Sequence, residues 1–89
     1  GLNTMTIFWN AGWNVASYTL QRRVKGESEW ATVKSGLPST TLSCSDGGTL
    51  LKGIYEYRIV AVSSSDETIP TPSVECDFNP RRGTAILYR

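Results

Sequence analysis

Residues 50–62 read Leu50-Leu51-Lys52-Gly53-Ile54-Tyr55-Glu56-Tyr57-Arg58-Ile59-Val60-Ala61-Val62. After the turn residue Gly53 the side chains alternate strictly. One face carries Tyr55, Tyr57, Ile59 and Ala61, and the other carries Glu56 and Arg58. A period of two is typical of a half-buried β-strand. Tyr55, at the start of this strand, occupies the place of a tyrosine corner. This stretch predicts an all-β sandwich.

The rest of the chain repeats the same kind of pattern. Short strands are predicted at residues 5–9, 17–24, 29–33, 40–44, 55–62 and 73–78. Turn residues separate them, among them Gly26, Gly36, Pro38 and the run Asp46-Gly47-Gly48. Gln21 and Arg23 share one face of the strand at residues 17–24, and Trp30 is expected to cover the sheet or the edge of the core. No helical period appears. About six strands at a spacing of roughly 8–12 residues predict two packed sheets rather than any helical architecture.

Length and charge narrow the classes of function. A chain of 89 residues makes one domain. Its formal net charge is +1, with both signs interspersed, whereas a nucleic-acid surface needs a strong basic excess. The longest apolar run is far too short to cross a bilayer. Residues 1–4 show neither the basic nor the apolar region of a signal peptide. We therefore expect no nucleic-acid partner and no membrane insertion.

The residues offer little for catalysis. The chain contains no histidine, so Ser-His and Cys-His nucleophile pairs are excluded. The eight carboxylates fit solvated strands and turns better than a cleft that shifts their pKa values. Two cysteines without histidine make a poor zinc site, and Asp46 with Asp66 and Glu67 gives too few oxygen ligands for calcium. We predict no enzyme activity, no metal site and no cofactor.

Four sequence segments, taken in order over about residues 4–78, carry the pattern of a known family. They are Thr6-Ile7-Phe8-Trp9, Tyr18-Thr19-Leu20-Gln21-Arg22, the run from Tyr55 to Val62, and Pro72-Ser73. In this order they resemble the second strand with its core tryptophan, the third strand, the sixth strand and the start of the last strand of a fibronectin type III domain. The resemblance implies an immunoglobulin-like sandwich with a core of Trp9, Tyr18, Leu20, Tyr55, Tyr57 and Ile59.

The two ends of the chain depart from the family. Only eight residues precede Trp9, so the first strand is short or missing. We assign residues 1–78 to the sandwich and residues 79–89 to an extension. Residues 84–88 form either part of a linker or an extra strand. Such a strand is expected antiparallel to residues 73–78 at that sheet's edge. If it took the place of the missing first strand, it would run parallel to the Trp9 strand, and it would be a poorer substitute for that first strand.

The cysteines also depart from the family. Alternation places Cys44 and Cys76 on inward faces. In the resembled topology their strands run in the same direction in opposite sheets, so a Cys44–Cys76 disulfide is plausible. It would contribute roughly 3–4 kcal/mol and indicate an oxidising compartment. The alternative is two buried free thiols.

A binding surface is expected at one end of the sandwich. Trp13, in the loop after the Trp9 strand, is available to stack on a sugar or to anchor a protein; alternatively it folds back over the core. Its neighbour across that end is the loop of residues 63–67. The candidate binding residues are Trp13, Asn14, Ser64, Asp66 and Glu67.

The resemblance implies a non-catalytic interaction or spacer module of a larger extracellular, secreted or virion-surface protein. Its partners would be proteins or neighbouring domains of the same chain. A carbohydrate-binding accessory module that uses Trp13 is the alternative. Since fold alone does not choose between these functions, the choice depends on the site. Edge strands left open by a short first strand would also permit pairing with another copy.

Overall fold

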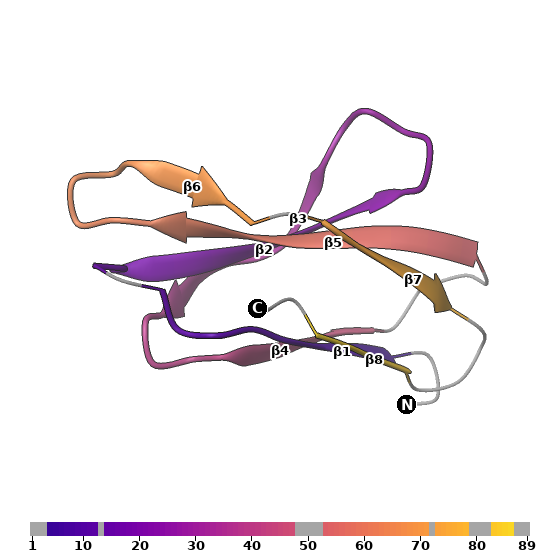
Figure 1. Ribbon diagram of the computed structural model, residues 1–89, viewed down its shortest axis with the longest axis horizontal. Coiled ribbons are helices and arrows are strands. Elements are labelled where there is room, and N and C mark those ends of the chain that lie inside the picture. The colour runs from indigo at the N-terminus through magenta and orange to yellow at the C-terminus, as the bar shows by residue number, and fades with distance from the viewer. Residues whose placement is uncertain (1–3, 13, 48–52, 72, 79–82, 87–89) are drawn as a thin grey trace.

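The computed structural model describes residues 4–12, 14–47, 53–71, 73–78 and 83–86. Within these ranges the chain is all β, and Figure 1 shows its strands in two facing layers. The strands are β1 (Thr4–Phe8), β2 (Ser17–Val24), β3 (Ala31–Pro38), β4 (Ser43–Gly47), β5 (Gly53–Val62), β6 (Thr68–Pro70), β7 (Val74–Phe78) and β8 (Gly83–Ile86). The all-β two-sheet sandwich predicted from the sequence is confirmed.

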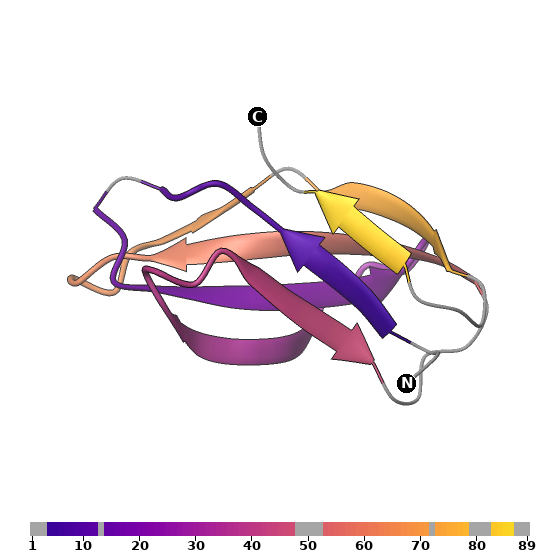
Figure 2. The same cartoon turned by 90° about the horizontal axis from the view of Figure 1, so that it is seen from below.

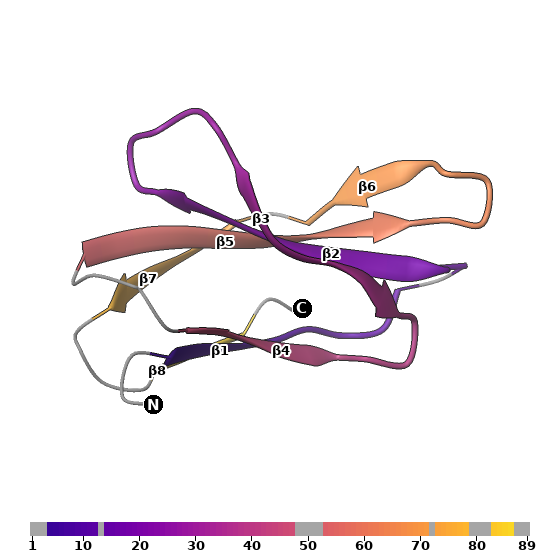
Figure 3. The same ribbon diagram turned by 180° about the vertical axis from the view of Figure 1, so that it is seen from behind.

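The two sheets differ in size. The smaller sheet has the order β4-β1-β8, and the larger has the order β3-β2-β5-β6, with β7 also paired to β5. The antiparallel pair β2–β5 is the centre of the larger sheet and runs without a break from Ser17↔Val62 to Val24↔Tyr55. Figures 1 and 3 show the small sheet packed against one face of this pair. The opposite face of β2 and β5 is the outer face of the sandwich.

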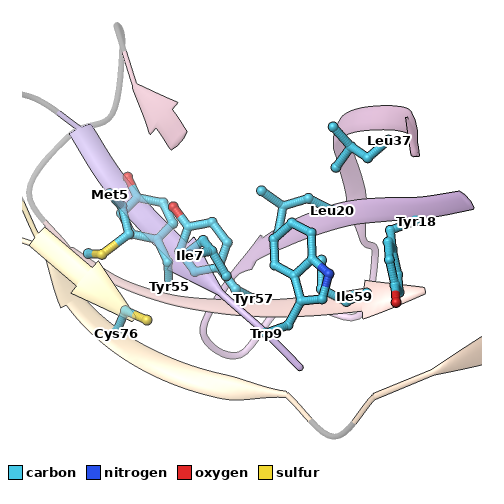
Figure 4. Close-up of a cluster of buried hydrophobic side chains, with 10 residues drawn as sticks. All are labelled: Met5, Ile7, Trp9, Tyr18, Leu20, Leu37, Tyr55, Tyr57, Ile59 and Cys76. Carbon is cyan, nitrogen blue, oxygen red and sulfur yellow. The ribbon is translucent and has the colours of Figure 1, made fainter. Parts of the chain in front are cut away.

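The core lies between the sheets and follows the period of two. On β5 the odd-numbered residues 55, 57 and 59 are buried, and on β2 the even-numbered residues 18 and 20 are buried. Figure 4 shows these side chains meeting those of β1. The buried apolar set is Met5, Ile7, Trp9, Tyr18, Leu20, Leu37, Tyr55, Tyr57, Ile59 and Cys76. All six residues proposed for the core from the sequence lie in this set.

The last strand of the larger sheet is divided into two parts along one edge of β5. β6 pairs with the C-terminal end of β5 through Ala61↔Ile69, and β7 pairs with its N-terminal end through Tyr55↔Cys76. Thr71 continues the pairing between them: its amide donates to the carbonyl of Ile59, and its hydroxyl accepts from the amide of Ile59. β6 was not predicted from the sequence, because two prolines at 70 and 72 obscure the strand pattern.

Residues 83–86 form β8 and belong to the sandwich, but not where an extra strand was expected. The antiparallel placement beside residues 73–78 is wrong, since β8 pairs in parallel with β1 through Met5↔Gly83 and Phe8↔Ile86. Figure 2 shows the arrows of β1 and β8 pointing the same way, against that of β7. β8 does run opposite to β7, as expected, but it belongs to the other sheet. There β8 covers the edge of β1 that β4 leaves open, and an unpaired edge is a liability.

Two predicted strand boundaries are also wrong. β3 was expected at residues 29–33 and β4 at residues 40–44, and each begins and ends later in the chain. Gly36 and Pro38 were interpreted as breakers, but β3 is an edge strand with register shifts, and Gly36 adopts a φ of 67°. Edge strands tolerate both a proline and a bulge glycine. Asp46 and Gly47 were interpreted as a turn, but they pair with Met5 and Thr4.

The disulfide proposed between Cys44 and Cys76 is not formed, and both residues are free thiols. The topology explains this correction. Cys44 lies on β4, on the side of β1 away from β8, whereas Cys76 lies on β7, which packs next to β8. Inward direction alone therefore does not bring the two sulfur atoms together. Burial raises the pKa of both thiols, and for Cys76 burial, with a smaller contribution from Glu75, raises the pKa to about 11.

The thiols should therefore react with a thiol reagent in two separate steps. Cys44 is half-buried and should be modified slowly in the native protein, while the buried Cys76 should react only as the protein unfolds. Mass spectrometry after timed labelling at pH 8, with and without denaturant, measures both rates. The Cys44→Ser variant assigns the first step. If the denatured protein reacted with the reagent only after reduction, the Cys44–Cys76 disulfide would be present after all.

Candidate functional site

The two loops singled out from the sequence lie at the same end of the sandwich. The amide of Ala16 donates to the carbonyl of Val62 over 2.8 Å, and Ser17 pairs with Val62 where β2 begins and β5 ends. The loop that leads into β2 and the β5–β6 loop are therefore neighbours, as Figure 1 shows. Asn14 is exposed there with a φ of 60°. Trp13, the residue on which the carbohydrate hypothesis depends, lies outside the described residues.

The β5–β6 loop closes on itself. The amide of Ser63 donates to the carbonyl of Glu67, and the amide of Asp66 donates to the carbonyl of Ser63. The hydroxyl of Ser63 also accepts from the amides of Ser65 and Glu67, at 3.3 and 3.1 Å. Asp66 adopts a φ of 66°, in the left-handed region that Asp tolerates in turns. Ser64, Asp66 and Glu67 are all exposed, so this hydrogen-bonded turn presents two acidic side chains to solvent.

Tyr18 anchors the loop that leads into β2. Its hydroxyl accepts from the amide of Gly12 over 2.8 Å, and its ring lies edge-on to that of Trp9 with centroids 5.6 Å apart. Gly12 is exposed, but a Cβ at this position would clash, because it would lie 2.7 Å from a methyl carbon of Val15. The loop backbone is thus fixed to the core on one side. Figure 4 shows Trp9 and Tyr18 at this end of the buried cluster.

A buried polar cluster at Asp46 joins the two sheets. Asp46 on β4 is 5% exposed, and its Oδ2 accepts from Arg22 on β2 at 2.5 Å and from the hydroxyl of Tyr57 on β5 at 2.8 Å. Burial, together with the hydrogen bond and charge of Asp46, raises the pKa of Tyr57, which therefore stays protonated. This geometry gives the carboxylate two strong donors. The cluster therefore ties the two sheets together through side chains of β2, β4 and β5.

A second polar cluster lies on the outer face of β2 and β5, and it was not predicted as a site from the sequence. The guanidinium carbons of Arg23 and Arg58 each lie 4.4 Å from the ring centroid of Trp30. Arg23 donates through Nε to Glu56, and Arg58 donates through Nε to Gln21, both over 2.7 Å. Each bond joins residues that are direct partners across the β2–β5 pair. We name these five residues the Trp30 cluster.

The alternation of side chains along the sequence provided one indication of the Trp30 cluster. Glu56 and Arg58 were correctly placed on the outward face of β5, and Arg23 and Gln21 on one face of β2. Trp30 was expected to cover the sheet or the edge of the core. Its position above the arginines depends on how the β2–β3 connection folds back, which Figures 1 and 3 show rising from the outer face. Such a long-range contact has no periodic signature.

Among the described residues, no group of three or more His, Cys, Asp or Glu side chains is placed to hold a metal ion. No helix in that part of the chain has the length and apolarity needed to cross a membrane.

Comparison with known proteins identifies a solved structure with a similar fold. No family model and no curated protein matches the sequence. A solved structure described as an Fn3-like protein from Clostridium thermocellum matches with a TM-score of 0.69 at 22% identity, covering 100% of this chain and 88% of that one. The fold is fibronectin type III-like. At this level of identity the likeness shows the fold alone, and it agrees with the resemblance drawn from the Trp9, Tyr18 and Tyr55 segments.

Proposed function

We propose that this fibronectin type III-like domain is a non-catalytic interaction or spacer module of a larger extracellular or virion-surface protein. The observation that carries the proposal is the course of the chain. β1 and β8 are adjacent and parallel, so the described chain enters and leaves the small sheet in the same direction. That course suits a module that holds other parts of a protein in line. The inter-sheet tie at Asp46 suits the same role, since a spacer must keep its shape.

The exposed turn at residues 63–67 supports a role in protein contacts. It presents Asp66 and Glu67 on a loop whose hydrogen bonds restrict its conformations, and a preorganised loop loses less entropy on binding. Its neighbour is the loop that contains Asn14. We therefore take this end of the domain as the first surface to test for a protein partner or a neighbouring domain.

A binding screen with three proteins tests the proposal: the native chain, Trp13→Ala, and a loop variant with Asp66→Asn and Glu67→Gln. Each is applied to immobilised glycans and to extracellular surface proteins. Saturable protein binding that only the loop variant loses supports the interaction role. Glycan binding that only Trp13→Ala loses would replace it with the carbohydrate alternative. Turnover of any glycan or peptide by the native chain would contradict the non-catalytic assignment.

A further inference from the structure

The Trp30 cluster holds two cations in fixed positions. The guanidinium of Arg23 contacts Trp30 and is bonded to Glu56, and that of Arg58 contacts Trp30 and is bonded to Gln21. Stacking on an aromatic ring and a hydrogen bond at Nε restrict two different motions of a guanidinium. Because the arginines are already ordered, a ligand that binds them does not have to bear that loss of side-chain entropy.

The donors of the cluster are only partly used. An arginine has five N–H donors, and among the described residues the side-chain hydrogen bond of each of these arginines uses the one on Nε. Within the described residues, Arg23 has a carboxylate partner in Glu56, whereas Arg58 bonds the neutral amide of Gln21. One positive charge on this face is thus unbalanced locally. The side chain of Arg23 is 25% exposed, so its remaining donors stay within reach of a ligand.

The spacing of the two arginines matches an extended polypeptide. Arg23 is the direct partner of Glu56, and Arg58 is two residues further along β5, which makes the arginines diagonal neighbours. Diagonal neighbours in adjacent strands lie about 7–8 Å apart. Residues i and i+2 on one side of an extended chain lie about 7 Å apart. Two carboxylates in a Glu-x-Glu segment can therefore reach both guanidinium groups together.

We propose that the outer face of β2 and β5 at the Trp30 cluster is a docking surface for an acidic, extended segment of polypeptide. This inference rests on the proposed interaction role and gives it a surface and a partner chemistry. Carboxylates suit the site because they accept two parallel bonds from a guanidinium fork. The charge of Arg58, which forms no ion pair with a carboxylate in the described part of the chain, provides the attraction, and Trp30 holds the forks in place.

Peptide titration followed by two-dimensional NMR tests the proposal. The probe is a blocked seven-residue peptide with a central Glu-Ser-Glu, and its control has Gln-Ser-Gln in the same place. We expect saturable shifts of the Arg23 and Arg58 Nε–H signals and of the Trp30 indole N–H, with no comparable shifts from the control peptide. Arg58→Gln should weaken binding about tenfold or more, because it removes charge-assisted hydrogen bonds.

Two further variants make the result specific to the cluster. Lys34→Gln removes the same charge from the exposed edge strand β3 and should bind as the native chain does. Arg58→Lys keeps the charge but not the planar fork and should bind with intermediate affinity. Equal binding of both peptides, equal loss in Lys34→Gln, or no binding by the folded protein would each overturn the proposal. Binding of an oligogalacturonate but not the acidic peptide would overturn it in favour of a sugar. In any of these cases, loop-dependent protein binding would leave the proposed function standing.

Discussion

Replacing Asp46 with alanine is expected to lower the free energy of unfolding by about 3 kcal/mol. The variant leaves Arg22 partly buried without its carboxylate and removes the acceptor of the Tyr57 hydroxyl. Loss of one partner of a buried pair is strongly destabilising, and the 31% exposure of the Arg22 side chain places this case at the lower end of the range. For a domain of this size the melting temperature should fall by roughly 15 °C, measured by circular dichroism.

Two control variants show whether the effect belongs to the tie between the sheets. Tyr57→Phe removes one of the two donors to Asp46 and should lower the stability by about 1–2 kcal/mol. Glu56→Gln breaks the ion pair with Arg23 on the outer face, where partly exposed pairs contribute less than about 1 kcal/mol. If Asp46→Ala and Glu56→Gln were equally stable, the inter-sheet cluster would have no special role.

The parts of the fold that were predictable are those with local signals. β2 and β5 alternate over eight and ten residues, so their faces follow from the sequence alone. The same alternation identified Tyr57 and Leu20 as core residues. It could not identify the role of Asp46, because an Asp-Gly-Gly run is typical of a turn and the residue was interpreted that way. Only its pairing with Met5 on β1 places it inside the sandwich.

The features that the sequence did not predict depend on contacts between distant segments. Alternation gives the direction of Cys44 and Cys76, but their separation depends on which edge each strand occupies. In the same way, the sequence predicted that β8 would run opposite to β7, but it did not predict the sheet to which β8 belongs. The Trp30 cluster brings together three separate segments, and neither arginine shows by its position alone that a tryptophan lies above it. Topology is therefore the information that local patterns lack.

Replacing Trp9 with alanine is expected to lower the free energy of unfolding by about 4 kcal/mol. Trp9 is 3% exposed and packs edge-on against Tyr18, which in turn holds the amide of Gly12. The substitution leaves a cavity at one end of the core and removes the ring contact that positions Tyr18. We therefore expect a second effect: the Gly12 amide should exchange with solvent faster than in the native protein. Denaturant unfolding and hydrogen exchange measure the two effects separately.

Trp9→Phe is the matched control, and it should lose less than half as much stability as Trp9→Ala. The indole Nε1 of Trp9 is buried and bonds no described residue, and a buried donor without a partner costs about 1–3 kcal/mol. Phenylalanine keeps a ring against Tyr18 and removes that donor, so part of the lost packing is offset. Equal losses in the two variants would contradict this account, because they would mean that the ring contact contributes nothing. Slow exchange of the Gly12 amide in Trp9→Ala would show instead that Tyr18 holds the loop without help from Trp9.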